Sequence, residues 1–217
     1  MRNSATTAHM SIAAVIFDLG GVVLESPLAV FADYERTLDL PVHTLNKGIV
    51  AAGATGAWAR LERGELTMRE FCVAFDAENA ARGVAISTET LLGQVAARSG
   101  IRPAVVTAIR TLRAHALKVA ALTNNWVSAD QADKMETLRC EFDVFVESTR
   151  VGLRKPDPRI YELTCRELGV QAERVAYLDD IGLNLKPARA LGMTTIKVDD
   201  IELALHQLAN VVGLDLR

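Results

Sequence analysis

A short apolar run that ends in a single acid, with two glycines close behind it, constrains the fold of this chain more than any other stretch. The run covers residues 13–17, and Asp18, Leu19, Gly20 and Gly21 follow it. A short apolar segment with β-branched residues, closed by glycine, is typical of a strand buried on both faces. Ligands bind at the carboxyl ends of such strands, so we expect Asp18 at a ligand site. The two glycines would let backbone N–H groups come close to an anion there.

The rest of the chain alternates short apolar runs with helical patterns. Further strands are expected at residues 117–122, 143–147, 175–178 and 194–198, and helices at 103–115, 128–138, 158–169, 184–191 and 201–212. Strands that alternate with helices predict right-handed crossovers and a parallel sheet. We therefore predict an α/β fold with a Rossmann-like parallel sheet.

One long region interrupts this alternation. Residues 25–98 repeat apolar side chains at helical spacing, as at Phe71 and Phe75, and show no strand pattern. Glycines divide the region into several helices. We expect an α/β core formed by residues 11–24 and 99–217, with a helical domain of residues 25–98 inserted into it. Residues 1–10 are predicted to be a disordered tail.

Composition limits the partners and the compartment. The net charge of −3 at pH 7 gives no general attraction to nucleic acid or to anionic membranes. No apolar run approaches the roughly 20 residues that span a bilayer, and the first ten residues lack the apolar core of a signal peptide. The three cysteines are far apart, as expected in a reducing compartment. We predict a cytoplasmic monomer or homodimer that acts on a small molecule.

Polar residues follow the expected strands at several places. They are Asp18, Thr123 with Asn124, Lys155, and Asp179 with Asp180. A parallel sheet brings the carboxyl ends of its strands to one edge, so these side chains should converge. Three carboxylates beside one lysine call for another cation, and Mg²⁺ prefers oxygen ligands together with substrate phosphate. An aspartate can also act as the nucleophile of phosphoryl transfer.

These motifs resemble those of the haloacid dehalogenase superfamily of hydrolases, in the order of that family. The four motifs are residues 18–22, residues 122–124, residues 155–156, and residues 179–180 with Asn184. The resemblance spans residues 12–214. It is greatest to the amino-terminal phosphatase domain of soluble epoxide hydrolases and to the similar domain of acyl-CoA dehydrogenase fusion proteins. The stretches at 151–161 and 178–189 account for that match, and residues 25–98 resemble the cap domain of the family.

The resemblance implies a metal site and a nucleophile. Asp18 would be the nucleophile and a Mg²⁺ ligand, and Gly20 would give its main-chain carbonyl to the metal. Asp180, together with Asp179, would complete the metal site. The implied enzyme is a Mg²⁺-dependent phosphohydrolase that hydrolyses a small phosphorylated metabolite through an aspartyl-phosphate intermediate.

The resemblance also implies how phosphate is held. Gly21, Thr123 and Asn124 would bind it, and Lys155 would neutralise charge between the phosphate and Asp18. Thr123 and Lys155 are therefore candidate catalytic residues together with Asp18.

One position departs from the family pattern. The phosphatases of the family usually have a second aspartate two residues after the nucleophile, as general acid and base, and here that residue is Gly20. Two alternatives follow, a hydrolase of the haloacid dehalogenase type and a catalytically degenerate phosphate-binding domain. Dehalogenases of the family also lack the second aspartate, but they work without Mg²⁺ and need no pair of acids such as Asp179 and Asp180. That pair favours the phosphatase.

Overall fold

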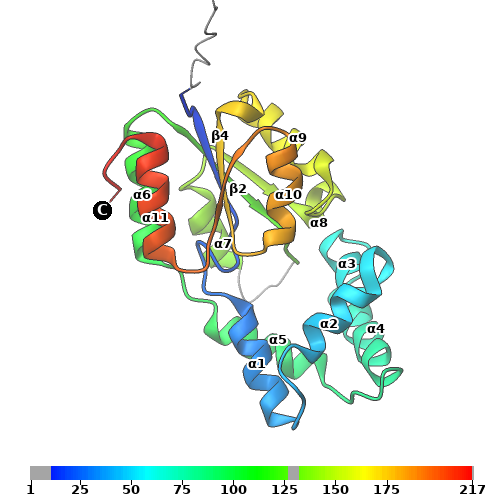
Figure 1. Cartoon of the computed structure of the whole chain (residues 1–217). Helices are drawn as coiled ribbons and strands as arrows, with labels where there is room; N and C mark the ends of the chain where they lie inside the picture. Colours follow the sequence, from blue (N-terminus) through cyan, green and yellow to red (C-terminus); the bar gives the residue numbers. More distant parts are fainter. Residues whose placement is uncertain (1–10, 127–131, 217) are drawn as a thin grey trace, which may run out of the picture.

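The computed structural model describes residues 11–126 and 132–216, and its centre is one five-stranded parallel sheet (Figure 1). The strands are β1 (Ala14–Phe17), β2 (Lys118–Thr123), β3 (Val144–Glu147), β4 (Val175–Asp179) and β5 (Thr194–Lys197). Their order in the sheet is β3-β2-β1-β4-β5. The predicted parallel α/β sheet is thereby confirmed, and each strand overlaps its expected range. The tail predicted for residues 1–10 lies outside the described residues.

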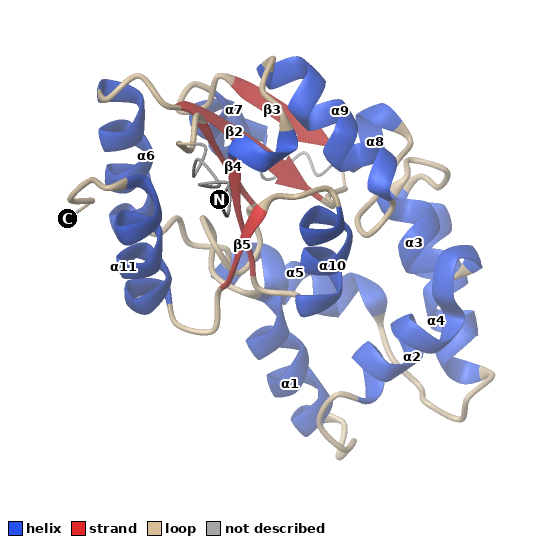
Figure 2. Ribbon diagram, turned by 45° about the horizontal axis from the view of Figure 1, so that its top comes forward, coloured by secondary structure: helices blue, strands red, loops and turns tan. Residues whose placement is uncertain are grey.

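Helices cover both faces of the sheet. One face packs against α6 (Pro103–Ala114), α7 (Ala132–Arg139) and α11 (Ile201–Val212), and the other against α9 (Pro158–Leu168) and α10 (Gly182–Ala190). The short helix α8 (Ser148–Val151) follows β3, and a 3₁₀ turn η3 (Ala172–Arg174) precedes β4. Successive side chains of a strand point to opposite faces, so β1, β2, β3 and β4 contribute to both apolar clusters, whereas β5 contributes Ile196 to the first alone. Figure 2 shows helices on both sides of the sheet.

Two helix starts test the sequence-based expectations. Helix α9 begins as predicted, because Asp157 caps it through the N–H of Arg159 and Pro158 occupies the first turn. The prediction for α10 was wrong by two residues. The Asp179 carboxylate accepts the N–H of Ile181, and the helix starts at Gly182. Pro187 therefore lies inside α10 rather than in its first turn. The predicted helix at 128–138 is described only from residue 132, as α7.

Residues 27–98, which we call the helical segment, form helices with an apolar cluster of their own. The helices are α1 (Pro27–Thr37), α2 (Thr44–Ala52), the 3₁₀ turn η1 (Gly53–Thr55), α3 (Ala57–Glu62), α4 (Met68–Ala80) and α5 (Thr88–Arg98). At the centre of the cluster, the Trp58 ring meets Phe31, Phe71 and Phe75 edge-on at 5.4–5.5 Å between centroids. As expected, this fully described segment contains no strand. Its status as a separate domain stays a prediction.

The chain enters and leaves the helical segment at one place. The N–H of Glu25 donates to the carbonyl of Gly100 at 2.9 Å, and the N–H of Arg102 donates to the carbonyl of Val23 at 2.9 Å. Leu24 and Ile101 also form an antiparallel bridge. The two crossings therefore lie side by side, immediately after the β1 loop.

Candidate active site

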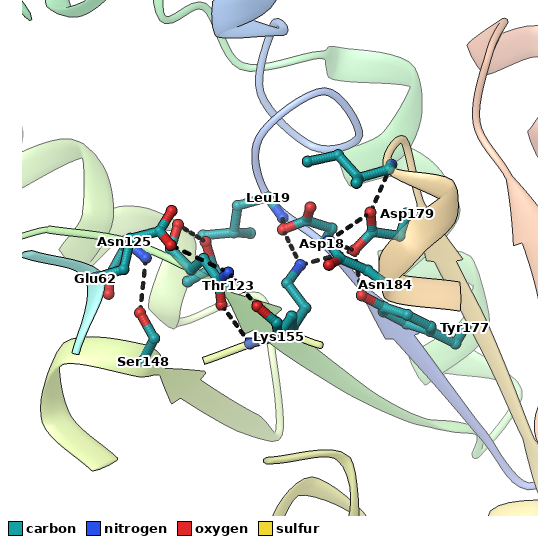
Figure 3. A network of polar contacts seen from close by, with 12 residues as sticks. Asp18, Leu19, Glu62, Thr123, Asn125, Ser148, Lys155, Tyr177, Asp179 and Asn184 are labelled. Atoms are coloured by element: carbon teal, nitrogen blue, oxygen red, sulfur yellow. Dashed lines mark hydrogen bonds and ion pairs between the residues drawn. The ribbon is translucent and has the colours of Figure 1, made fainter. Parts of the chain in front are cut away.

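The predicted site residues meet at the carboxyl edge of the sheet (Figure 3). Asp18 directly follows β1, and Asp179 ends β4, its neighbour in the sheet. The N–H of Asp18 donates to the carbonyl of Leu178 at 2.9 Å, which fixes the two strand ends to each other. In the sheet, β2 and β3 lie on one side of β1, and β4 and β5 lie on the other side. The strand order therefore reverses between β1 and β4, and ligands of an open α/β sheet bind at the carboxyl ends of the strands at such a point.

Lys155 lies between the two acids. Its side chain is 1% exposed, and its Nζ is 2.8 Å from Asp18 Oδ1 and 2.8 Å from Asp179 Oδ2. Burial by itself would lower the pKa of Lys155. The two carboxylates outweigh burial and raise this pKa above its ordinary value, so the side chain is a buried cation.

Asp179 is the best supported of the acids. It is fully buried, and it accepts hydrogen bonds from Lys155 Nζ, the Tyr177 hydroxyl, the Asn184 amide at 3.1 Å and the Ile181 N–H at 2.7 Å. Burial would raise its pKa, but Lys155 and the other donors lower it below the ordinary value. Asp179 therefore keeps its charge and fixes the ammonium.

Asp18 and Asp180 have fewer donors. The bonds to Asp18 come from Lys155 and from the N–H of Leu19 at 2.7 Å, and burial raises the pKa of Asp18 well above its usual range. Burial and the Asp179 charge raise the pKa of Asp180 to about 6, and the Ser26 hydroxyl donates to it at 3.3 Å. Asp18, Asp179 and Asp180 place oxygen atoms within 4.8 Å of one another. Three carboxylates around one ammonium leave an excess of negative charge, which suits a hard cation with oxygen ligands.

The glycines after β1 have different surroundings. Gly21 has a φ of +80°, and a Cβ at this residue would lie 2.0 Å from Asp180 Oδ2. Only glycine fits there, because the Asp180 carboxylate packs directly against the loop. Gly20 has a φ outside the left-handed region, and the nearest atom to a Cβ there is Pro27 Cδ at 3.9 Å. A Cβ would therefore fit at Gly20, the position where the sequence analysis expected the second aspartate of related phosphatases.

The second motif, residues 122–124, is hydrogen-bonded to the third motif, residues 155–156, through Asn124 and Lys155. Thr123 ends β2 with 4% exposure. The Asn124 side chain accepts the Lys155 N–H at 2.8 Å and donates to the Lys155 carbonyl at 3.0 Å. Asn124 was expected to bind phosphate, but its side-chain amide is already paired with the Lys155 backbone. This side chain fixes the loop that positions Lys155.

A cavity of about 310 Å³ opens next to these residues, with Gly20, Thr123 and Asn124 in its wall. Further wall residues come from the two crossings, including Glu25, and from the helical segment, including Val30. A bound organic group could therefore lie between the sheet edge and the helical segment.

The sequence analysis missed Tyr177 and Glu62. Tyr177 lies two residues before Asp179 in β4, so both side chains share a face, a relation that strand periodicity could have shown. Glu62 contacts Arg154 and Asn124, 92 and 62 residues further along the chain. No local pattern in the sequence could have shown those contacts.

Comparison with known proteins identifies relatives over most of the chain. Residues 12–192 match the family model of haloacid dehalogenase-like hydrolases. The chain is 37% identical over 209 residues to acyl-CoA dehydrogenase family member 10 of Mus musculus, and 35% identical over 222 residues to bifunctional epoxide hydrolase 2 of Sus scrofa. Each match covers 95% of this chain, but only 20% and 40% of the two relatives, so the chain spans less than half of either. A phosphatase of Mycobacterium tuberculosis is 31% identical over 195 residues, with 88% of both chains covered.

A solved structure agrees with the fold. A HAD family enzyme of Bacteroides thetaiotaomicron, determined in complex with magnesium and inorganic phosphate, matches with a TM-score of 0.60. The identity is 18%, and the match covers 86% of this chain and 94% of that chain, so this likeness shows the fold alone. Within the described part of the chain, no helix has the length and apolar character needed to cross a membrane.

Proposed function

This chain belongs to the haloacid dehalogenase-like hydrolases, and on that premise we propose that it is a Mg²⁺-dependent phosphatase of a small phosphate monoester. The observation that supports this most is the buried excess of carboxylate at the sheet edge, where three acids surround the single ammonium of Lys155. A phosphatase among the relatives, and a neighbour of the same fold determined with magnesium and phosphate, point in the same direction. On composition, we further propose that it acts in the cytoplasm as a monomer or homodimer.

The residues present fit a divalent cation. We assign Asp18, Asp180 and the main-chain carbonyl of Gly20 as ligands, with Asp179 within reach of the same point. Asp179 accepts bonds from four donors, which favours it as the acid that holds Lys155 rather than as the main ligand. When bound, Mg²⁺ would neutralise the carboxylates and polarise the phosphoryl group.

Asp18 would be the nucleophile. Both of its described hydrogen bonds fall on Oδ1, so Oδ2 is the oxygen proposed to attack phosphorus. The new O–P bond replaces the bond from phosphorus to the substrate oxygen. That oxygen leaves as an alkoxide, or as the neutral alcohol where an acid supplies a proton. Water then hydrolyses the aspartyl phosphate, which releases inorganic phosphate and restores the carboxylate.

The phosphate itself would be held by four groups. They are the Lys155 ammonium, the Thr123 hydroxyl and the backbone N–H groups of Gly21 and Asn124. The backbone is proposed for Asn124 because its side-chain amide is paired with Lys155. Lys155 would also offset the charge that accumulates between the phosphate and Asp18.

The leaving group is where this site differs from the family pattern. A positioned general acid contributes about 10² to 10⁴ in rate, and Gly20 provides none. We therefore propose that the enzyme prefers acyl, aryl or anomeric phosphates, whose leaving oxygens need a proton less than a simple alcohol does. Glu25 and His43 are two side chains that we consider as alternative proton donors. Glu25 lines the cavity, whereas His43 is absent from its described wall.

The test is phosphate release from a panel of phosphate esters, with Mg²⁺ and with chelator. We expect release to require the metal, and a phosphoryl donor to add the mass of a phosphoryl group to the peptide that contains Asp18. Hydrolysis of 2-haloacids without Mg²⁺ would replace the proposal by a dehalogenase. Phosphate binding without turnover of any ester would replace it by a degenerate binding domain.

A second measurement addresses Gly20. We expect kcat/KM of the natural chain to fall steeply as the pKa of the leaving alcohol rises, and the slope to flatten in Gly20→Asp. The backbone at Gly20 is outside the left-handed region, and a Cβ there meets no atom closer than 3.9 Å. A flat slope in the natural chain would show that another acid is present, and Glu25→Gln would then be the next variant to measure.

A further inference from the structure

A buried carboxylate of the helical segment reaches the loops of the proposed active site. Glu62 is the last residue of α3 and is 6% exposed. Its Oε2 accepts from Arg154 Nε at 2.6 Å and from Asn124 Nδ2 at 3.4 Å, and its Oε1 accepts the indole N–H of Trp58 at 3.0 Å. Arg154 directly precedes Lys155 in the chain. Figure 3 shows Glu62 beside the second-motif residues, on a ribbon that comes from the helical segment.

The contacts continue from Glu62 to the nucleophile. Asn124, which Glu62 contacts, exchanges two hydrogen bonds with the Lys155 backbone. The Nζ of Lys155 then pairs with Asp18 Oδ1 at 2.8 Å. Polar contacts therefore connect the helical segment to Asp18 through Asn124 and then through the backbone and side chain of Lys155.

Two contacts that involve no charge hold α3 against the same part of the core. The Trp58 ring meets Trp126, which follows β2, edge-on at 5.7 Å between centroids. After α3, Gly64 has a φ of +72°, and a Cβ there would lie 2.8 Å from the carbonyl oxygen of Thr149 in α8. Close contact at both ends of α3 leaves Glu62 a fixed position relative to the site.

The Glu62–Arg154 pair is not explained by stability. Burial raises the pKa of Glu62 above its ordinary value by more than Arg154 lowers it, so the ionised carboxylate is costly to bury. Glu35, also buried, differs from it. Glu35 accepts the N–H groups of His43 and Leu45 inside the helical segment and touches no site residue among its described bonds.

We infer that Glu62 is a positioning residue, which holds Arg154 and Asn124 from the helical segment and thereby sets Lys155 against Asp18 for phosphoryl transfer. The inference rests on the proposed phosphatase function. Contacts between the helical segment and the core then become part of the catalytic geometry, because Lys155 is correctly placed only while Glu62 of α3 keeps its contacts with Arg154 and Asn124.

The first arm of the test is kinetic. A displaced Lys155 affects the reacting complex, so Glu62→Gln and Arg154→Gln should each lower kcat roughly 10- to 100-fold, with KM changed much less. The double variant should be no worse than Glu62→Gln alone, because the contact that Arg154→Gln removes is already lost in Glu62→Gln. Glu35→Gln, the matched buried acid, should lower stability but leave kcat unchanged. Multiplicative losses in the double variant, or an equal loss of kcat in Glu35→Gln, would overturn the inference.

The second arm needs no turnover. Trp58 and Trp126 are the two tryptophans of the chain, so Trp126→Phe leaves Trp58 as its single tryptophan, which is excited selectively at wavelengths where the three tyrosines do not absorb. In this background, Arg154→Gln and Glu62→Gln should shift Trp58 emission to the red and increase its quenching by acrylamide. Glu65→Gln, which removes an exposed acid paired with Arg63, should change neither.

The two arms separate the inference from the function on which it rests. If the natural chain hydrolyses no phosphate ester, the proposed function fails. The fluorescence of Trp58 still shows whether Glu62 and Arg154 hold α3 against the core. Unchanged Trp58 emission in both variants overturns the inference even in an active phosphatase. So does a shift in emission without a loss of kcat. Should Glu62→Gln fail to fold, Arg154→Gln supplies both measurements, since the Arg154 side chain is 25% exposed.

Discussion

The helical segment and the sheet edge use carboxylates in opposite ways. In the helical segment, Glu62 reaches the core, but the buried Glu35 and the partly buried Asp76 and Glu78 join stretches of the segment itself through matched donors. Glu35 accepts two backbone N–H groups at 2.6 and 2.7 Å, Asp76 accepts the N–H of Thr88 at 2.9 Å, and Glu78 accepts the N–H of Ala57 at 2.7 Å. These groups would otherwise be unsatisfied, so the acids stabilise the segment.

At the sheet edge, carboxylates outnumber cations. Among the described contacts, the Lys155 ammonium pairs with Asp18 and Asp179 but not with Asp180, and Asp179 alone of the three acids has four donors. The pKa values of Asp18 and Asp180 are raised, which means that the fold resists their charged forms. Replacing an acid of the helical segment by its amide should therefore lower the stability of that segment. The same replacement at Asp18 or Asp180 should not lower the stability of the sheet edge, although it should abolish its function.

The largest expected effect is that of Asp18→Asn. Loss of the nucleophile should lower turnover by on the order of 10³ or more. Since a raised pKa means that ionised Asp18 costs folding free energy at neutral pH, the variant should be at least as stable as the natural chain. Phosphate release and the urea midpoint of the metal-free protein measure the two effects.

Asp179→Asn is the matched control for this change. The pKa of Asp179 is lowered, so the fold favours its charge and the variant should be less stable. Equal losses of stability in Asp18→Asn and Asp179→Asn would contradict this difference between the two acids, of which the fold favours the charged form of Asp179 and disfavours that of Asp18.

The next effect in size is that of the metal. Mg²⁺ should raise the Tm of the natural chain, because it supplies the charge that the sheet edge lacks, and saturation at 100 times Kd corresponds to about 2.7 kcal/mol. Asp180→Asn should reduce this shift strongly. Asp39→Asn, at an exposed residue whose left-handed φ of 54° asparagine tolerates, should keep it. An equal Mg²⁺ shift in all three proteins would place the cation elsewhere.

The two regions also differ in how much the sequence could reveal. The position of Asp18 was predictable because strand periodicity and glycine signals are local, and a parallel sheet collects strand ends at one edge. The contact between Glu62 and Arg154 was not, because it depends on packing between segments far apart in the chain. The error at Pro187 has a different, local origin, because the Asp179 carboxylate accepts the N–H of Ile181 two residues on and α10 begins directly after it.

A smaller effect is expected in the helical segment. Glu35→Gln leaves one of the two N–H groups without an acceptor and the other with a neutral acceptor, which should lower the free energy of unfolding by about 1–3 kcal/mol. The Mg²⁺-induced shift of Tm should stay as in the natural chain, because Glu35 touches only its own region among the described residues. Urea unfolding with and without Mg²⁺ measures both, and a lost Mg²⁺ response would mean that the two regions share their stability.

The smallest expected effect comes from two glycines with the same backbone but different neighbours. Gly83 in the helical segment has a φ of +77° and no atom within 4 Å of a Cβ, whereas a Cβ at Gly21, with φ +80°, meets Asp180 Oδ2 at 2.0 Å. Alanine at either residue should cost about 1–2 kcal/mol of unfolding free energy for the left-handed backbone. Only Gly21→Ala should also weaken the Mg²⁺-induced shift of Tm, because the Asp180 carboxylate must move away from the new methyl group. An unchanged shift in Gly21→Ala would mean that Asp180 can bind the cation from a second position. The close packing around Gly21 would then restrict substitution no more than the open surroundings of Gly83 do.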